Sequence, residues 1–160
     1  MKIIALYGKP NTGKTTTLNL VVKSLKQDSS ELEKPEIGVL DNRYYLKLSD
    51  GRTVCITTAG DDWETQNDNL NYVKERNPDI WITASHTKDD STAPVLEPVR
   101  NGAIGYVTWI RKLFPVTIMH SNSAYRYETD QPSVFLDSIC NRMNQIDADR
   151  ILNMIYYDKN

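Results

Sequence analysis

An eight-residue segment near the start of the sequence, Gly8–Thr15, constrains the fold more than any other feature. It has glycine at its first and sixth positions, and Lys14 and Thr15 follow the second glycine directly. The preceding apolar run, residues 3–7, is typical of a strand covered on both faces in a parallel sheet. Apolar residues then recur with helical spacing, which predicts a helix over residues 14–26. The segment is therefore expected to connect a buried strand to a helix.

The residue types in this segment suit the binding of a polyphosphate. Gly8 and Gly13 let the backbone turn so that successive N–H groups point inward, where side chains would crowd the ligand. The start of the following helix adds roughly half an elementary positive charge. Lys14 supplies a compact cation for the β- and γ-phosphates, and the Thr15 hydroxyl suits Mg²⁺. The residues expected to contact the nucleotide are Gly8, Asn11, Thr12, Gly13, Lys14, Thr15 and Thr16.

The spacing G-x-x-x-x-G-K-[ST] resembles the Walker A motif of the P-loop nucleoside triphosphate hydrolase superfamily and matches it at every fixed position. The resemblance implies a bound nucleoside triphosphate, with Mg²⁺ held at Thr15. It is specific for phosphate binding and not for the reaction, because the superfamily includes hydrolases, kinases and switches.

The rest of the chain alternates buried strands with helices. Residues 44–48 and 54–56 predict two strands, and Asp50-Gly51 between them favours a tight antiparallel hairpin. Residues 80–84 predict another buried strand, whereas residues 27–34 have no apolar period and predict a solvated loop.

In the second half of the sequence, apolar spacing predicts a helix over residues 99–114 and then a strand over residues 116–119. A further helix is predicted over residues 132–146, with Asp147 or Asp149 as the cap of another. The whole pattern predicts one α/β domain, residues 1–160, with a three-layer αβα P-loop fold and a mostly parallel sheet with one antiparallel hairpin. Ligand chemistry is expected at the carboxyl ends of the strands, near Gly8, Thr58, His86 and His120.

The hairpin leads into residues 57–61, Thr-Thr-Ala-Gly-Asp, which resemble the second switch of Ras-like GTPases, where Asp-x-x-Gly precedes Gln. Thr57 stands where that Asp is expected, so the usual carboxylate that supports Mg²⁺ is missing. Gly60 can offer its N–H to a γ-phosphate, and Asp61 has the position that orients the attacking water. Asp61 or Asp62 is expected either to replace the missing carboxylate through a water or to serve as a solvated turn or helix cap. The residues after them, up to 77, show only a weak helical stripe.

Other polar residues allow several interpretations. Thr87-Lys88-Asp89-Asp90 is superficially similar to the guanine-reading motif Asn-Lys-x-Asp, but it precedes the strand that this motif should follow. ATP is therefore preferred to GTP. Further candidates, each with a structural or solvated role as the alternative, are Lys88, Arg100, Arg111 and Arg126 for phosphate charge, His86 and His120 as bases, Asp41 and Arg43 near an acceptor, and Tyr44, Tyr45, Tyr125 and Tyr127 for stacking.

Composition excludes several classes of protein. Hydrophobic residues make up 39% and charged residues 25%, a balance typical of a folded globular domain. The net charge of -2 disfavours a nucleic-acid partner bound through a broad cationic field. Cys55 and Cys140 lack metal-ligand spacing and are expected to be reduced core thiols. No apolar run reaches membrane-spanning length, so no membrane partner is expected and the cytoplasm is the expected compartment.

Three functions follow from this pattern. The first is Mg²⁺-dependent binding of a nucleoside triphosphate, ATP favoured, with slow γ-phosphate hydrolysis as an NTPase or nucleotide switch that a protein partner activates. The second is a kinase that transfers the γ-phosphate to a small-molecule or nucleotide acceptor. The third is a non-catalytic nucleotide-binding module, because Thr57 replaces the expected acid.

Overall fold

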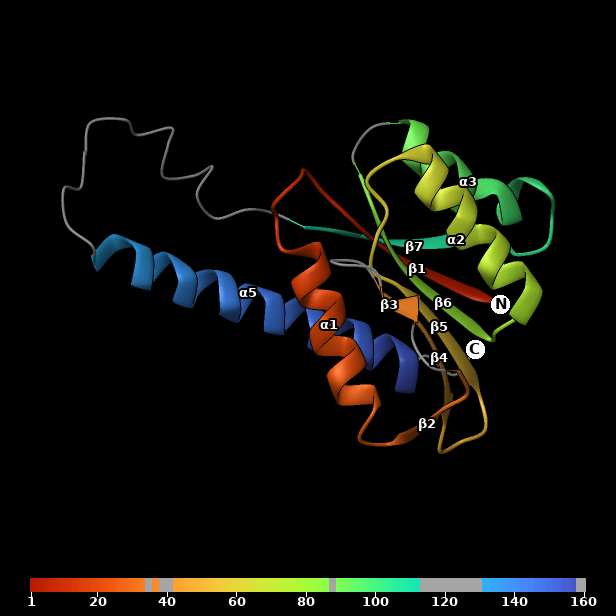
Figure 1. Ribbon diagram of the computed structural model, residues 1–160, viewed down its shortest axis with the longest axis horizontal. Coiled ribbons are helices and arrows are strands. Elements are labelled where there is room, and N and C mark those ends of the chain that lie inside the picture. The colour runs from red at the N-terminus through yellow and green to blue at the C-terminus, as the bar shows by residue number, and fades with distance from the viewer. Residues whose placement is uncertain (34–35, 38–41, 87–88, 113–130, 158–160) are drawn as a thin grey trace.

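The computed structural model describes residues 1–33, 36–37, 42–86, 89–112 and 131–157. In chain order, the helices and strands are β1 (Lys2–Tyr7), α1 (Lys14–Leu25), β2 (Ser29–Glu31), β3 (Glu36–Ile37), β4 (Asn42–Leu48), β5 (Thr53–Thr57), α2 (Trp63–Arg76), β6 (Ile80–Ser85), α3 (Asp89–Arg100), β7 (Val107–Arg111) and α5 (Gln131–Tyr156) (Figure 1).

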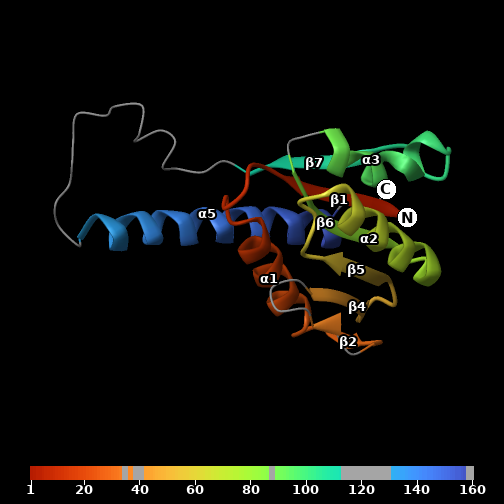
Figure 2. The ribbon, with the colours of Figure 1, turned by 45° about the horizontal axis from the view of Figure 1, so that its top comes forward.

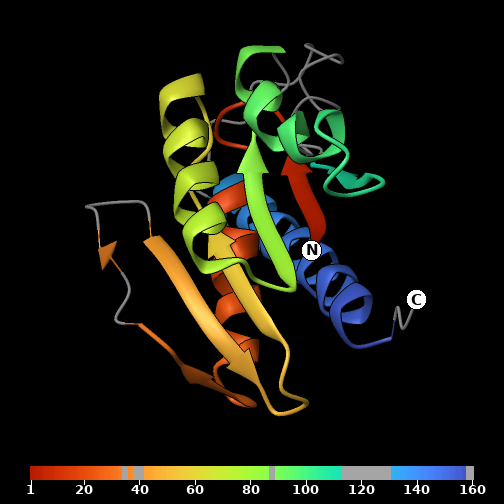
Figure 3. The same cartoon turned by 90° about the vertical axis from the view of Figure 1, so that its right-hand side faces the viewer.

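The strands form a mixed sheet in the order β2-β4-β5-β6-β1-β7, and β3 pairs with β4. β1 is parallel to both of its neighbours, β6 and β7, and β5 is parallel to β6. β4 runs antiparallel to β2, β3 and β5. In Figure 3 the arrows of β1 and β6 point the same way, whereas the arrow of β4 points the opposite way. The α/β class is therefore confirmed, and β6 separates β1 from β5.

Helices cover both faces of the sheet (Figure 3). On one face, α1 and α5 bury an aliphatic cluster that includes Ile4, Ile56 and Ile82 of the strands. On the other face, α2 and α3 pack over a second cluster that includes Ile3 and Trp81. Successive residues of β1 point to opposite faces, and both faces are covered, which is why this strand is continuously apolar instead of alternating.

α5 is one continuous helix of 26 residues. Its C-terminal half packs against α1, with Ala148 and Ile151 fully buried. Its N-terminal half extends beyond the other described helices and strands (Figures 1 and 2). The predicted break at Asp147 or Asp149 is wrong, because the first pairs with Lys112 and the second accepts a hydrogen bond from Gln145, inside an unbroken helix. No described helix, α5 included, is long and apolar enough to cross a membrane.

The predicted helix over residues 99–114 is wrong. α3 ends at Arg100, where Gly102 adopts a left-handed φ of 71° and donates its N–H to the carbonyl oxygen of Val99, a common helix ending. Residues 107–111 form β7 instead, because their β-branched and aromatic side chains fit an edge beside β1. Phe114 and the predicted strand over residues 116–119 lie outside the described residues.

Smaller differences concern the antiparallel side of the sheet. The predicted loop over residues 27–34 contains β2, and β4 is antiparallel to β2, β3 and β5, so the sheet is mixed and the prediction of a mostly parallel sheet with one antiparallel hairpin is wrong. The weakly periodic stretch after Asp61 forms a full helix, α2. The strands predicted over residues 3–7 and 80–84, the helix from Lys14 and the hairpin are confirmed.

Candidate functional site

The segment between β1 and α1 forms a loop with two residues in the left-handed region. The angle φ is 59° at Asn11 and 86° at Gly13, and Thr12 between them lies outside this region. Such alternation turns successive N–H groups toward one side, as in an anion-binding nest. Gly13 is also the N-cap of α1, where no side chain accepts a hydrogen bond from the first turn. The loop and the start of α1 therefore retain backbone donors for a ligand.

Close neighbours require glycine at both ends of this loop. A methyl group on Gly8 would lie 2.8 Å from the carbonyl oxygen of Lys112 and 2.9 Å from the Thr12 hydroxyl. A methyl group on Gly13 would lie 2.6 Å from Oδ1 of Asn144, and its φ disfavours any side chain. Packing around the loop therefore explains both glycines, in addition to the space that a ligand needs.

Lys14 lies over the loop and is only 6% exposed. Its Nζ donates to the carbonyl oxygens of Gly8 and Lys9, each at 3.1 Å. It also lies 3.3 Å from Oδ1 of Asp61, whose side chain is 66% exposed. An anionic oxygen can therefore reach this ammonium group from the solvent side.

A cavity of about 300 Å³ opens beside Lys14, where β1 and β5 end. Its walls come from the loop, the start of α1, the segment after β5 and the start of α2. The lining residues are Asn11, Gly13, Lys14, Thr15, Thr58, Ala59, Gly60, Asp61, Asp62 and Thr65. The structure thus brings together the two segments that the sequence singled out.

A larger cavity, of about 490 Å³, lies at the opposite ends of the parallel strands, where β1 and β6 begin. None of the described residues that line it belongs to a helix, and its two basic side chains, Lys2 and Arg52, donate to the carbonyl oxygens of Met154 and Ile155. The smaller cavity is the better candidate, because it combines a cation with backbone donors that no side chain caps.

Buried amides of α2 hold the segment that follows β5. Asn69 Nδ2 donates to the carbonyl oxygen of Ala59 at 3.0 Å, and Gln66 Nε2 donates to that of Ala84 on β6. Gly60 lies so close to β6 that a methyl group there would be 1.9 Å from the Ala84 oxygen. These contacts fix the backbone of the segment at the wall of the cavity.

The two threonines at the end of β5 face different surroundings. Thr57 is fully buried, and its Oγ1 donates to Oγ1 of Thr83 at 2.9 Å and accepts from Nε1 of Trp81 at 3.1 Å. Thr58 lines the cavity, and its carbonyl oxygen accepts from Oγ1 of Thr15 at 3.4 Å. A carboxylate at position 57 would be buried in the sheet rather than in the cavity, which explains why a hydroxyl residue stands there.

The two acidic candidates differ in their contacts. Asp62 is the N-cap of α2, since its carboxylate accepts from the N–H and the hydroxyl of Thr65, both at 2.8 Å. These hydrogen bonds, the backbone one first, hold the pKa of Asp62 below its usual value. The helix-cap interpretation is therefore confirmed for Asp62. Asp61 is the carboxylate that contacts Lys14, and a role for either one in the reaction stays a prediction.

Three of the four residues predicted to gather at the carboxyl edge lie there, namely Gly8, Thr58 and His86. The ends of β1 and β6 are joined by a hydrogen bond from the Gly8 N–H to the carbonyl oxygen of Ser85. His86 does not line the cavity, and its backbone N–H donates to Oγ of Ser91 at 3.1 Å. His120 lies outside the described residues.

The remaining candidates have structural contacts or are exposed. Arg43 on β4 donates through Nε to Oδ1 of Asn69 at 3.0 Å, and the two predicted tyrosines of β4 are half-buried. Arg100 ends α3 and Arg111 ends β7, and both are exposed. The candidates outside the described residues are Asp41, Lys88, Tyr125, Arg126 and Tyr127.

The predictions from sequence did not include three buried polar residues that support the site. Gln66 and Asn69 on α2 and Asn144 on α5 are each at most 6% exposed. Gln66 and Asn69 lie on the buried side of α2 together with Leu70, and Asn144 lies on the buried side of α5 together with Ala148. A polar residue on an otherwise apolar helical stripe is the signal that could have identified them.

No protein-family model, curated protein or solved structure gave a significant match to the chain.

Proposed function

We propose that the chain is a P-loop domain, with an αβα arrangement of three layers, that binds a nucleoside triphosphate in the cavity beside Lys14. The main observation in support is the loop over residues 8–13. Its two left-handed residues, the uncapped start of α1 and the Lys14 ammonium all offer donors or positive charge to one space. We favour ATP as the nucleotide because the sequence has no guanine-reading motif in the expected place.

The energetics favour a polyphosphate over the resident carboxylate. Asp61 is 66% exposed, so solvent screens its ion pair with the buried Lys14 and keeps that pair weak. Each hydrogen bond from the loop to a charged phosphate oxygen contributes about 1.5–3 kcal/mol. Several such bonds would displace Asp61 from Lys14 without difficulty.

Magnesium suits the oxygen atoms that the cavity offers. Mg²⁺ at a nucleotide takes one or two protein ligands and fills its other positions with phosphate oxygens and waters. The Thr15 hydroxyl would supply one such ligand. Within the described residues, no three His, Cys, Asp or Glu side chains form a metal-holding group, so we propose that Mg²⁺ binds together with the nucleotide. Bound there, it would neutralise charge on the β- and γ-phosphates.

For the reaction we propose slow hydrolysis of the γ-phosphate. Lys14 would hold the γ-phosphate oxygens, the Gly60 N–H would donate to them, and Asp61 would orient the attacking water. The described part of the chain places no arginine on the cavity wall. Turnover is therefore expected near the roughly 10⁻⁴ per second of an unassisted switch, rather than the 1–100 per second of kinases. A protein that supplies an arginine to the γ-phosphate would be the activating partner.

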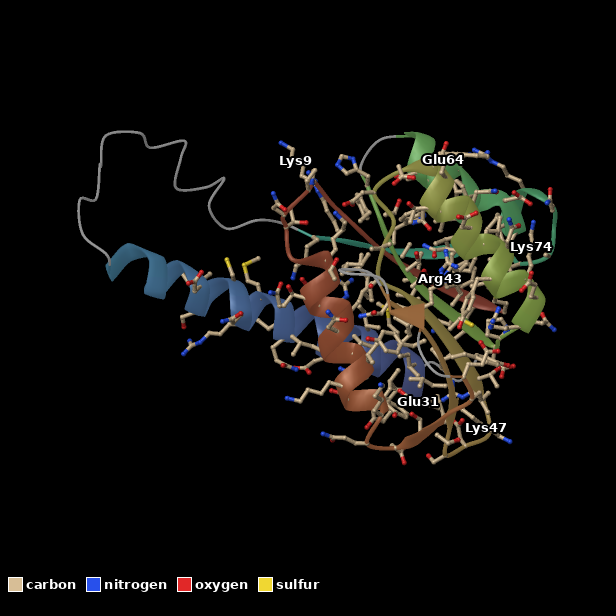
Figure 4. The ribbon with its side chains drawn as sticks, viewed as in Figure 1. Lys9, Glu31, Arg43, Lys47, Glu64 and Lys74 are labelled. Carbon is tan, nitrogen blue, oxygen red and sulfur yellow. The ribbon has the colours of Figure 1, made fainter. Side chains whose placement is uncertain are left out.

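A thermal-shift panel tests the proposed ligand. The ligands are ATP, GTP, CTP, UTP and their diphosphates, each with and without Mg²⁺. The wild type should gain about 2.7 kcal/mol of stability at a triphosphate concentration 100-fold above Kd, and Lys14→Ala should gain none. Lys9→Ala is the matched control and should respond like the wild type, because this neighbouring lysine is exposed and extends outward from the loop (Figure 4).

Phosphate release from the same proteins separates binding from turnover. Release that requires a metabolite or nucleoside would identify a kinase, and intact ATP at high protein concentration would identify a non-catalytic module. Equal stabilisation of the wild type and Lys14→Ala would contradict the proposed site.

A further inference from the structure

A buried amide of α5 contacts the C-terminal end of the loop over residues 8–13. Asn144 is 6% exposed, and its Oδ1 accepts from Oγ1 of Thr17 at 3.3 Å. The same oxygen would be 2.6 Å from a methyl group on Gly13. The Asn144 side chain thus occupies the space beside Gly13, the left-handed N-cap residue of α1.

The same turn of α5 also supports the N-terminal end of the loop. Asp147 lies three residues after Asn144, on the same side of the helix, and pairs with Nζ of Lys112 at 2.6 Å. The Lys112 backbone N–H donates to the carbonyl oxygen of Tyr7 at 2.7 Å. The Lys112 carbonyl oxygen leaves no space for a side chain at Gly8. One helical turn therefore reaches both ends of the loop, directly at one end and through Lys112 at the other.

Two of the hydrogen bonds inside the loop come from Lys14, the residue that the ligand would engage, and a third runs from Oγ1 of Thr12 to the carbonyl oxygen of Lys9 at 2.9 Å. In this structure Lys14 Nζ ties the loop together through the carbonyl oxygens of Gly8 and Lys9. An ammonium group has three donors, and a polyphosphate would compete for them. The contacts from α5 do not involve Lys14, so they persist when it turns to the ligand.

We propose that Asn144 is a positioning residue for phosphate binding, which it promotes by holding Gly13 in the conformation that the nest requires. This inference rests on the proposed function. Its energetic basis is preorganisation, because a loop that is already ordered loses less conformational entropy on binding. A neutral amide also suits this position, since a carboxylate beside the loop would repel the phosphates.

Two substitutions at this position test the proposal. Asn144→Ala removes the contacts with Thr17 and Gly13. Asn144→Asp keeps the size and the acceptor for Thr17 but adds negative charge, and it serves if the alanine variant does not fold. Asn141→Ala is the matched control, because Asn141 is exposed one turn earlier on α5.

Calorimetric Kd values for ATP with Mg²⁺ and for inorganic pyrophosphate are the first readout. Asn144→Ala should raise both by about fivefold, because a less ordered loop loses more conformational entropy on binding, and Asn144→Asp should raise both because its charge repels the phosphates. Hydrogen exchange of the ligand-free protein is the second readout. Loop amides over residues 9–13 should exchange faster in Asn144→Ala, with the strands unchanged. Asn141→Ala should match the wild type in both.

A merely structural role would lower Tm but leave both Kd values and the loop exchange unchanged. Binding within twofold of the wild type by both Asn144 variants would overturn this inference and leave the proposed function intact. A wild-type protein that binds neither ligand would overturn both.

Discussion

Among the glycines of the site, Gly60 is the one that neighbouring backbone atoms constrain most. A methyl group there would be 1.9 Å from the carbonyl oxygen of Ala84, which also accepts the hydrogen bond from Gln66. Neither a carbonyl oxygen in a central strand nor its buried partner can move away easily. The residue therefore fixes how closely the wall of the cavity approaches β6.

Gly60→Ala should destabilise the protein by about 1–3 kcal/mol, the usual cost of overpacking a rigid site. Urea denaturation followed by circular dichroism measures the change. Gly105→Ala is the control, because nothing lies within 4 Å of a methyl group at Gly105 and its φ is not left-handed. Equal stability of the two variants would show that the segment after β5 does not pack against β6 in this way.

At the residue scale, the sequence predicted positions that depend on the local turn and missed positions that depend on packing. Lys14 and Thr15 lie where the motif predicts, because the local turn is encoded within a few residues. Asn144 could not be paired with Gly13 from sequence, since the contact depends on the packing of α5 against α1. The same holds for the burial of Thr57, which depends on Trp81 and Thr83 of the adjacent strand.

Among the elements, α2 shows how a polar sequence becomes a helix. It has a weak apolar stripe, but Asp62 caps its first turn and Asn77 ends it in a left-handed conformation with φ 44°. The ends of α2 are therefore specified locally even though its middle is not. The cap also lies on the wall of the cavity, so its stability affects the shape of the site.

Asp62→Ala should cost about 0.5–2 kcal/mol of stability at neutral pH, the usual value of an N-cap. The pKa of Asp62 in the folded protein lies below its ordinary value of 3.8. The contribution of the carboxylate is therefore present above that value and is lost as pH falls through the lower, folded value. The urea midpoints of the wild type and of Asp62→Ala should therefore differ at neutral pH and converge at acidic pH. Asp62→Ser keeps an acceptor without this titration, so its difference from Asp62→Ala should persist in acid.

α3 and β7 show where element prediction failed and why. Pro94 and Pro98 lie inside α3, and a proline removes an N–H donor and usually ends a helix, so the sequence favoured a later helix. The apolar residues after Gly105 fit either a helix or a strand by spacing alone. Residues 107–111 form a strand rather than a helix because β1 offers them backbone partners along its free side. That free side exists only once the sheet has assembled.

For the whole molecule, the two cysteines report on whether the sheet is assembled. Cys55 is fully buried in β5, and burial raises the pKa of its thiol to about 12. Cys140 is half-buried on α5. A thiol reacts as its thiolate, so the two should differ strongly in reactivity.

One thiol per chain should react rapidly with Ellman's reagent in the native protein, and two should react in urea. Cys140→Ser should leave no rapidly reacting thiol in the folded state. Rapid labelling of Cys55 in that variant under native conditions would mean that β5 is not covered as described.

Every residue of β1 pairs with a residue 78 positions later in β6, from Lys2 with Ile80 to Tyr7 with Ser85. At translation rates of about 5–20 residues per second, β1 exists for about 4–16 seconds before that partner is made. Its other neighbour, β7, emerges later still. A nascent chain on the ribosome therefore carries the apolar strand that precedes the loop without a sheet to receive it.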